Sequence, residues 1–173
     1  MIYLDSGAVA KLARQEEHSA DLVDWLNAHA DVPLVSSVLV EVEVPRVLRR
    51  SAPQALVGAP GAIGRLFRVE VDATIRSAAA GFAEPTLRAS DAIHLATAQV
   101  LANESGRDLT AFVTYDQRLM EAAQAAGLTT ACPGRDRTAW LENPSAPPPT
   151  EGAPSAGTGY EWEHTAGWQV PGA

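Results

Sequence analysis

The sequence predicts an α/β domain with a mainly parallel central sheet and helices on both of its faces. Two observations lead to this fold class. Short apolar segments typical of buried strands alternate along the chain with segments whose apolar residues recur at helical spacing. Such alternation is typical of parallel sheets covered by helices. The chain also has 173 residues, of which 46% are hydrophobic, so it can build one domain of ordinary size with a real core.

The first elements follow from short-range patterns. A strand is expected at residues 1–5, where an apolar run ends in Asp5. Helices are expected at 7–15 and 19–30. In the second of these, apolar residues repeat at helical spacing and Ser19 is the expected N-cap. A short buried strand is expected at 33–37.

The segment 38–50 supports two interpretations. Its alternation of Val and Glu is typical of a half-exposed strand, whereas its charged end and the preceding Ser-Ser favour a capped helix. Pro45 is unfavourable inside either element. We predict a helix that is distorted near Pro45.

The second half of the chain continues the alternation. Weak helix broken by Gly and Pro is expected at 52–67, a short strand at 68–71, and helices at 72–83 and 88–104. A strand at 109–116 ends in Asp116. It is followed by a helix at 117–127 that Gly127 closes, and by a last strand at 128–133.

The composition changes after about Pro144. Residues 143–173 are rich in Pro, Gly, Ser and Ala, and they have too little apolar surface to offset their ordering entropy, so we predict a disordered tail. The folded domain is then expected at 1–142. The aromatic stretch "YEWEHTAGWQVPGA" is either an unstructured end or a short recognition segment.

Charge and cysteine content restrict the class of protein. The net charge of −8 argues against broad non-specific nucleic-acid binding, but it allows an enzyme whose acids hold metal ions. The single cysteine, Cys132, permits no internal disulfide and is expected to be a small core residue. No secretory signal and no apolar run of membrane-spanning length are found. A cytoplasmic protein without membrane contact is therefore expected.

Acidic residues stand at corresponding ends of these elements. Asp5 and Asp116 end strands, and Asp91 lies in the first turn of its helix. Ligands of open parallel sheets bind beyond the carboxyl ends of the strands, so these acids can meet at one edge. Glu41 and Glu43 lie two residues apart on a predicted helix, and only one of them can face the same site.

Such a group of carboxylates needs a counter-charge. The acids would repel each other unless some were protonated or a cation lay among them, and Mg²⁺ or Mn²⁺ takes all-oxygen ligands. Taken alone, Asp91 and Asp116 could instead cap their helices, Asp5 could be a turn residue or a cap, and Glu43 could be a solvated helix acid. We expect His94 to be a buried, hydrogen-bonded histidine rather than a ligand. Arg46, one turn after Glu43, could orient that carboxylate, hold a phosphate or simply be solvated.

Four segments resemble the blocks of a known family. "MIYLDSGAVAKL", "LVSSVLVEVEVPRVLRR", "LRASDAIHLATA" and "FVTYDQRLMEAAQAAGL" are similar, in order and spacing, to those of the PIN-domain ribonucleases, and most similar to the VapC toxins of bacterial toxin–antitoxin pairs. The resemblance covers about residues 1–133. It implies a PIN-like domain of three layers.

The resemblance also assigns residues. The second acid of the family precedes "x-x-Arg-aliphatic", which selects Glu43 over Glu41. Ser6 follows the first acid, and Thr114 begins the "T-x-D" of the fourth. Pro45 departs from the pattern, because the family usually has a helix former there. The implied acids are Asp5, Glu43, Asp91 and Asp116.

The resemblance implies metal-dependent hydrolysis of RNA. Asp5, Asp91 and Asp116, with Glu43, would hold Mg²⁺ or Mn²⁺. Asp5 and Asp91 would be direct ligands, whereas Asp116 and Glu43 would act partly through water. Ser6 and Thr114 would hydrogen-bond water or substrate. The implied partners are a cognate VapB-like antitoxin and a second copy of the chain.

The sequence leaves three alternative functions. A catalytically inactive PIN-fold binding module is one, and a metal-dependent nuclease outside a toxin–antitoxin pair is another. The third, a receiver-like signalling domain, is disfavoured. It needs two adjacent acids after the first strand and a lysine after the last, whereas Lys11 is the chain's single lysine.

Overall fold

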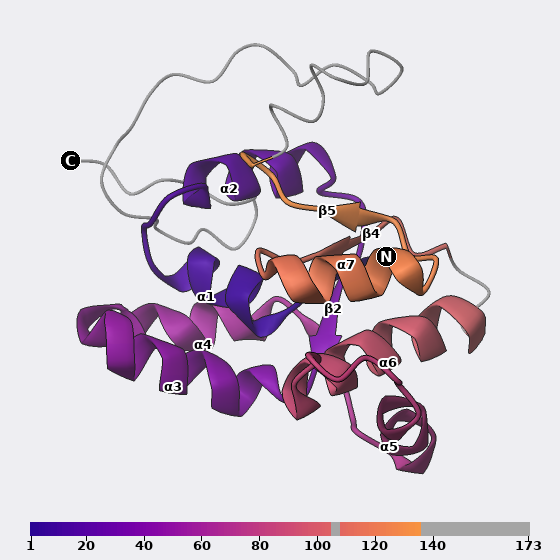
Figure 1. Ribbon diagram of the computed structural model, residues 1–173. Coiled ribbons are helices and arrows are strands. Elements are labelled where there is room, and N and C mark those ends of the chain that lie inside the picture. The colour runs from indigo at the N-terminus through magenta and orange to yellow at the C-terminus, as the bar shows by residue number, and fades with distance from the viewer. Residues whose placement is uncertain (105–107, 136–173) are drawn as a thin grey trace.

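The computed structural model describes residues 1–104 and 108–135 (Figure 1). Residues 136–142 of the predicted domain and the whole predicted tail, 143–173, lie outside the described residues. The boundary at residue 142 and the disorder of the tail therefore stay predictions.

The centre of the fold is a five-stranded parallel sheet with the strand order β3-β2-β1-β4-β5. All four strand pairs are parallel, which confirms the predicted class of sheet. The strands are β1 (Ile2–Leu4), β2 (Leu34–Ser37), β3 (Phe67–Val69), β4 (Ala111–Val113) and β5 (Thr130–Ala131).

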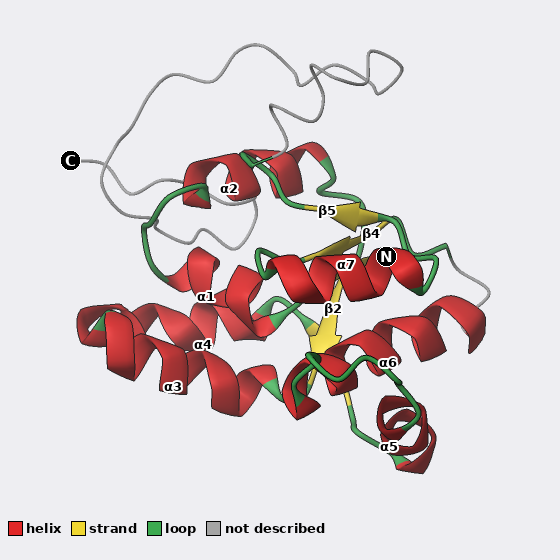
Figure 2. Ribbon diagram, in the orientation of Figure 1, coloured by secondary structure: helices red, strands yellow, loops and turns green. Residues whose placement is uncertain are grey.

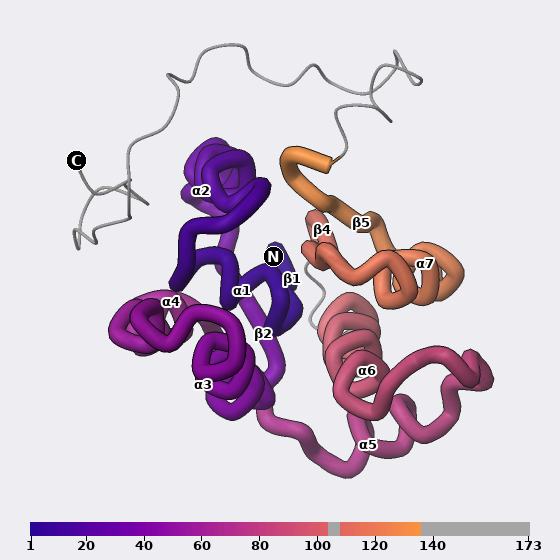
Figure 3. The backbone as a smooth tube through the Cα atoms, turned by 60° about the vertical axis from the view of Figure 1, so that its left-hand side comes forward, coloured from indigo at the N-terminus to yellow at the C-terminus, as the bar shows by residue number. Residues whose placement is uncertain are grey.

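Helices lie on both sides of this sheet (Figures 2 and 3). Helices α1, α2, α3 and α4 build the apolar layer on one face. Helices α6 and α7 cover the other face, and α5 packs against α6. The helices are α1 (Ser6–Ala13), α2 (Ser19–Ala28), α3 (Val40–Ser51), α4 (Ala59–Gly64), α5 (Ala73–Ala80), α6 (Ala89–Glu104) and α7 (Gln117–Ala125), with a 3₁₀ helix η1 (Pro53–Gly58).

The central strand β1 shows why the sheet needs two helical layers. Ile2 and Leu4 belong to the core on the α1 side, whereas Tyr3 belongs to the core on the α6 side. Side chains of a strand alternate between faces, so a strand that is apolar at every position must be buried on both. All three residues are fully buried. The three-layer α/β/α architecture is thus confirmed.

The strand order also determines where a ligand can bind. The chain runs outward from β1 through β2 to β3, and then returns to the other side of β1 for β4 and β5. The order reverses between β1 and β4, and ligands of open α/β sheets bind in the crevice beyond the carboxyl ends at this point. Asp5 and Thr114 directly follow these two strands.

Ser19 was wrongly expected to be an N-cap. It is the first residue of α2 and is fully buried, and His18 precedes it with a left-handed backbone (φ 64°). The Ser19 hydroxyl donates to the carbonyls of Lys11 and Arg14 and accepts from the Glu16 N–H. It therefore stabilises the connection between α1 and α2 by binding its backbone groups, instead of capping α2.

Other elements differ from the expectations in their bounds. Helix α3 runs uninterrupted through Pro45, where a distortion was expected. The segment 52–67 forms η1 and α4, in keeping with weak helix. Strand β4 ends at Val113, so Asp116 lies in the turn beyond it rather than at its end. Shortening of this kind is common where a strand leaves the sheet before the next helix begins.

Two smaller expectations are confirmed. Gly127 follows α7 with φ 81°, its N–H donates to the Gln124 carbonyl, and the Leu128 N–H donates to the Ala123 carbonyl. This is the Schellman arrangement that ends a helix on a left-handed glycine. Cys132 is fully buried, as expected of a small core residue. Within the described residues, no helix combines the length and apolar character that a membrane crossing requires.

Candidate active site

Asp5 is the most enclosed carboxylate of the predicted site. It follows β1 and caps α1, with Oδ1 accepting from the Ala8 N–H at 2.7 Å and Oδ2 accepting from the Thr114 hydroxyl at 2.6 Å. Burial raises the pKa of Asp5; these two hydrogen bonds oppose the rise and the negative charge of Asp91 adds to it. Asp5 is thus both a helix cap and an electrostatically strained acid.

Asp116 is connected to Asp5 through Thr114. The Thr114 hydroxyl that donates to Asp5 also accepts from the Asp116 N–H at 3.1 Å. Asp116 caps α7 by accepting from the Arg118 and Leu119 N–H groups. Its Oδ2 pairs with the Arg118 guanidinium at 3.0 Å, and this hydrogen bond holds the pKa of Asp116 below its usual range.

Asp91 is not the N-cap of its helix. It is the third residue of α6, and its carboxylate accepts from the backbone N–H of Arg88 and, weakly, from the Ser90 hydroxyl at 3.4 Å. The reach back to a free N–H at the helix start resembles half of a capping box. Burial raises the pKa of Asp91, and the charge of Asp116 raises it further. Asp91 is therefore coupled to both other aspartates.

Glu43 reaches the same region from α3. Its Oε2 accepts from the Ser6 hydroxyl at 2.6 Å and lies 3.0 Å from His94 Nε2. Burial opposes ionisation of Glu43, but hydrogen bonds from His94 and Ser6 outweigh it and hold its pKa below the usual value. A further hydrogen bond comes from Ser90. Glu43, like Asp116, is therefore an acid of this group that the surroundings keep charged.

His94 is buried and hydrogen-bonded, as expected from the sequence. It is 2% exposed, and it contacts Ser6 and Glu43 through Nε2 and the Tyr3 hydroxyl through Nδ1 at 2.9 Å. Both ring nitrogens thus have partners within the protein.

The donor set fits a hard divalent cation in its chemistry. Three coupled aspartates, two of them with raised pKa values, gather at the switch point of the sheet, and a cation among them would remove their repulsion. In residues 1–104 and 108–135, however, no three His, Cys, Asp or Glu side chains are already arranged as ligands of one ion. Each carboxylate already has hydrogen-bond donors within the chain, among them the Arg88 N–H for Asp91 and the Arg118 guanidinium for Asp116.

Comparison with known proteins agrees with this geometry. The model of the family described as PIN domain matches residues 2–125. The chain belongs to the PIN-domain family. It is 47% identical over 137 residues to Ribonuclease VapC35 from two strains of Mycobacterium tuberculosis, which covers 79% of this chain and all of the relative. It is 39% identical over 132 residues to Ribonuclease VapC46 of the same organism, covering 76% of this chain and 97% of the relative.

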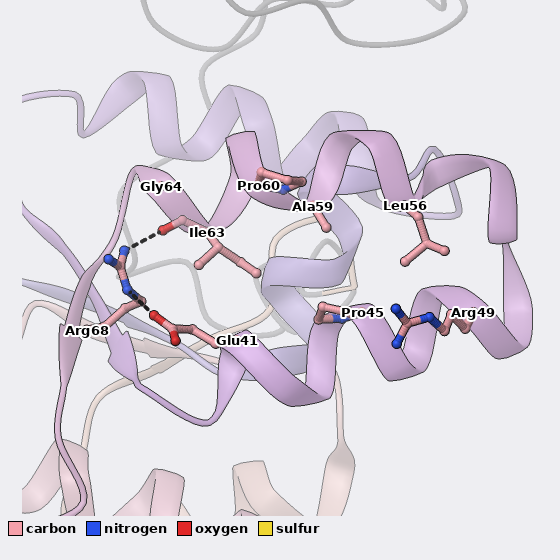
Figure 4. Close-up of a pocket in the computed structure, with 9 residues that line it drawn as sticks. All are labelled: Glu41, Pro45, Arg49, Leu56, Ala59, Pro60, Ile63, Gly64 and Arg68. Atoms are coloured by element: carbon pink, nitrogen blue, oxygen red, sulfur yellow. Dashed lines mark hydrogen bonds and ion pairs between the residues drawn. The ribbon is translucent and has the colours of Figure 1, made fainter.

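The two glutamates of α3 in this PIN domain have different surroundings. Glu43 contacts Ser6 and His94, whereas Glu41 pairs with Arg68 at 2.7 Å on the rim of a separate pocket of about 550 Å³ (Figure 4). None of the four predicted acids lines this pocket. Its lining residues are Glu41, Pro45, Arg49, Leu56, Ala59, Pro60, Ile63, Gly64 and Arg68. The distinction between Glu41 and Glu43 therefore agrees with their separate orientations on the helix.

Arg46 was predicted to belong to the site, but in the described part of the chain the structure shows no polar contact between its side chain and the acids. It is exposed, and within the described residues no hydrogen bond or ion pair joins it to Glu43. Ser6, His94 and Ser90 hold that carboxylate instead. The prediction that Arg46 orients Glu43 thus receives no support, and the two alternatives, a phosphate contact and a solvated side chain, stay predictions.

Sequence reasoning missed Tyr3 and Arg118. Tyr3 lies mid-strand among apolar residues, and a buried tyrosine needs a partner for its hydroxyl, which was the available signal. Arg118 lies two residues after Asp116 at a helix start, a position from which a guanidinium can fold back onto the cap. These patterns do not identify the residue that each side chain contacts, because that depends on how the helices and strands pack.

Proposed function

We propose that this PIN domain is a metal-dependent endoribonuclease that acts as the toxin of a toxin–antitoxin pair. The observation that carries the proposal is the coupling of Asp5, Asp91 and Asp116 at the switch point of the sheet, beside an ionised Glu43. The names of the relatives, Ribonuclease VapC35 and VapC46, support RNA as the substrate class.

Asp5, Asp91 and Asp116 are the proposed ligands of Mg²⁺ or Mn²⁺, with Glu43 bound partly through water. When bound, such an ion lowers the pKa of a coordinated water and neutralises charge that develops on the phosphate. No histidine or thiolate is needed, because hard cations prefer oxygen. Cys132 is buried, and His94 has partners at both ring nitrogens.

The side chains around the acids have distinct proposed roles. The Ser6 and Thr114 hydroxyls hold Glu43 and Asp5 and can hydrogen-bond water or substrate. Glu43 stays a carboxylate and orients water at the site. Arg46 and Arg118 are exposed and cationic, so they can contact RNA phosphates. Contacts of this kind would offset part of the repulsion between RNA and a chain of net charge −8.

The proposed partner is a VapB-like antitoxin. The acidic site favours a partner that presents an arginine. Such an arginine could bind the same carboxylates that Arg118 and Arg88 contact within the chain. A homodimer in the cytoplasm, without membrane contact, completes the proposal.

An RNA cleavage assay with the full chain tests the enzymatic role. We expect cleavage in Mg²⁺ or Mn²⁺, none in excess EDTA, and none by Asp5→Asn in either condition. An enzyme that is fully active in EDTA contradicts the metal mechanism. A well-folded protein that binds RNA but never cleaves it would favour the inactive binding module.

Co-expression tests the toxin role separately. The chain alone should stop growth of a bacterial host, and the reading frame next to its gene should restore it. Ribonuclease activity without growth arrest would favour a metal-dependent nuclease outside a toxin–antitoxin pair.

A further inference from the structure

A chain of hydrogen bonds runs from the central strand to Glu43. The Tyr3 hydroxyl lies 2.9 Å from His94 Nδ1, and His94 Nε2 lies 3.0 Å from both Ser6 Oγ and Glu43 Oε2. The Ser6 hydroxyl donates to the same Glu43 oxygen at 2.6 Å. These four residues come from β1, α1, α3 and α6, so the chain crosses three layers of the fold.

The ionised carboxylate determines where the protons lie. A carboxylate can only accept, so the facing His94 Nε2 must carry hydrogen and donate it to Glu43, with Ser6 Oγ as a second acceptor. The other ring nitrogen, Nδ1, has the Tyr3 hydroxyl as its partner at 2.9 Å. Both ring nitrogens of His94 are therefore held by hydrogen bonds within the protein.

The inner end of this chain is fixed by packing. Tyr3 is fully buried, and its ring stacks on Phe112 of β4 with centroids 5.2 Å apart and an angle of 5° between the ring planes. His94 meets Tyr3 edge-on at 5.9 Å. Glu43, in contrast, is half-buried on a helix of the opposite layer. The closely packed Tyr3 and His94 thus hold the more exposed Glu43 carboxylate.

We propose that His94 is a positioning residue that orients the Glu43 carboxylate by donating from Nε2, while Tyr3 fixes the imidazole. The inference rests on the proposed function, in which Glu43 acts in RNA hydrolysis. It goes further in giving a buried histidine, which lies outside the metal ligands, a role in catalysis that is exerted through Glu43. A histidine that only fills the core would stabilise the fold without affecting the rate through that glutamate.

Two amide substitutions separate these roles. The amide of His94→Gln reaches the position of Nε2 and can donate to Glu43, whereas that of His94→Asn reaches only the position of Nδ1. We expect His94→Gln to keep kcat within about fivefold of wild type. His94→Asn should lower kcat about 10- to 100-fold with little change in KM, the range for losing one hydrogen bond to a charged group. Equal kcat values for the two variants would overturn the inference.

A control and a double-mutant cycle complete the kinetic test. His29, which binds the Trp25 carbonyl on α2, is a half-buried histidine outside the network, so His29→Leu should leave kcat unchanged. In a Glu43→Gln background, His94→Asn should cause no further loss, because the residue acts through Glu43. Additive losses would overturn the proposal, and melting temperatures check that each variant folds.

Imidazole NMR of the full chain gives a readout that does not depend on activity. We expect the ¹⁵N shifts to show a hydrogen on Nε2, and a change in the Nε2 signal in Glu43→Gln. A ring protonated at Nδ1 alone would overturn the proposal. If the wild-type protein cleaves no RNA, the proposed function fails and the NMR result decides the inference by itself.

Discussion

Asp5, Asp91 and Asp116 differ in what holds each carboxylate. Asp5 is buried between the start of α1 and Thr114, whereas Asp116 is drawn outward by Arg118. Asp91 lies between these extremes, half-buried and coupled by charge to both. Asp91 is thus the residue where the loss of one charge should be easiest to measure.

Replacing Asp91 with Asn should stabilise the metal-free protein at neutral pH. Asn keeps an acceptor for the Arg88 N–H but removes a charge that burial and Asp116 disfavour. Because the pKa of Asp91 is raised, the folded wild type binds more protons than the unfolded chain at pH values between the ordinary 3.8 and the folded pKa. Its free energy of unfolding therefore falls as pH rises through that window.

Thermal melts in EDTA measure this effect. The Tm of Asp91→Asn should exceed that of wild type at neutral pH, and the difference should shrink toward zero near the ordinary pKa of 3.8, where wild-type Asp91 is protonated. Cleavage in Mg²⁺ should be lost. A variant that cleaves like wild type at limiting Mg²⁺ would show that Asp91 serves only the helix start.

The two glutamates of α3 should respond very differently to the same change. Glu43→Gln removes the charge that Ser6 and His94 hold at the site, and RNA cleavage should fall by at least about a hundredfold, as for other lost electrostatic groups in transition states. Glu41→Gln weakens a largely exposed pair with Arg68 and should be nearly neutral. Initial rates at saturating RNA test both, and the reverse order would mean that the assignment around Pro45 is wrong by two residues.

At the scale of elements, helix ends place the site. Asp5 caps α1, Asp116 caps α7, and Asp91 lies in the first turn of α6. N-terminal helix ends carry free N–H groups and favour negative charge, so three helices can hold three carboxylates close together. At the C-terminal end of α7, Gly127 adopts a left-handed conformation, and hydrogen bonds from the residues there satisfy the last carbonyls of the helix.

Gly127→Ala should destabilise the fold without affecting chemistry. At φ 81° a Cβ costs roughly 1–2 kcal/mol, although no neighbouring atom lies within 4 Å of it. Urea titration should therefore show a lower midpoint with an unchanged slope. Gly64→Ala is the matched control, since its backbone is not left-handed and its Cβ would also meet nothing within 4 Å. An unchanged midpoint for Gly127→Ala would show that the Schellman turn contributes little.

At the scale of the whole molecule, acidity and metal binding are linked. The chain has a net charge of −8, and part of it is concentrated where burial raises the pKa values of Asp5 and Asp91. A cation that binds the folded chain alone stabilises it in proportion to the logarithm of its concentration. The site should therefore be a source of metal-dependent stability as well as of activity.

Mg²⁺ or Mn²⁺ should raise the Tm of the wild-type protein above its value in EDTA. The increase should grow with metal concentration, and it should be smaller in Asp91→Asn, which lacks one of the proposed ligands. Differential scanning calorimetry at constant ionic strength, with Na⁺ as the matched control, separates specific binding from screening. An equal increase in wild type and variant would place the metal elsewhere.

Much of this fold could be predicted from local patterns. Alternating strand-like and helical segments gave the parallel sheet, and acids at their ends gave the proposed site. Exact ends were less predictable. The Ser19 hydroxyl binds backbone groups of the connection between α1 and α2 instead of capping a helix, and β4 stops short of Asp116. Whether a polar residue caps a helix or stabilises a loop depends on which neighbours lack partners once the chain has packed.

The sequence by itself determined the class of fold and the residue types of the site, because hydrophobic period and helix-start chemistry act over a few neighbouring residues. Only the tertiary structure decided which groups meet. Tyr3 and His94 are separated by 91 residues and Ser6 and Glu43 by 37, yet each pair is in hydrogen-bonding contact. Such contacts depend on the strand order and on how α3 and α6 pack over opposite faces of β1, which are properties of the assembled core rather than of any segment.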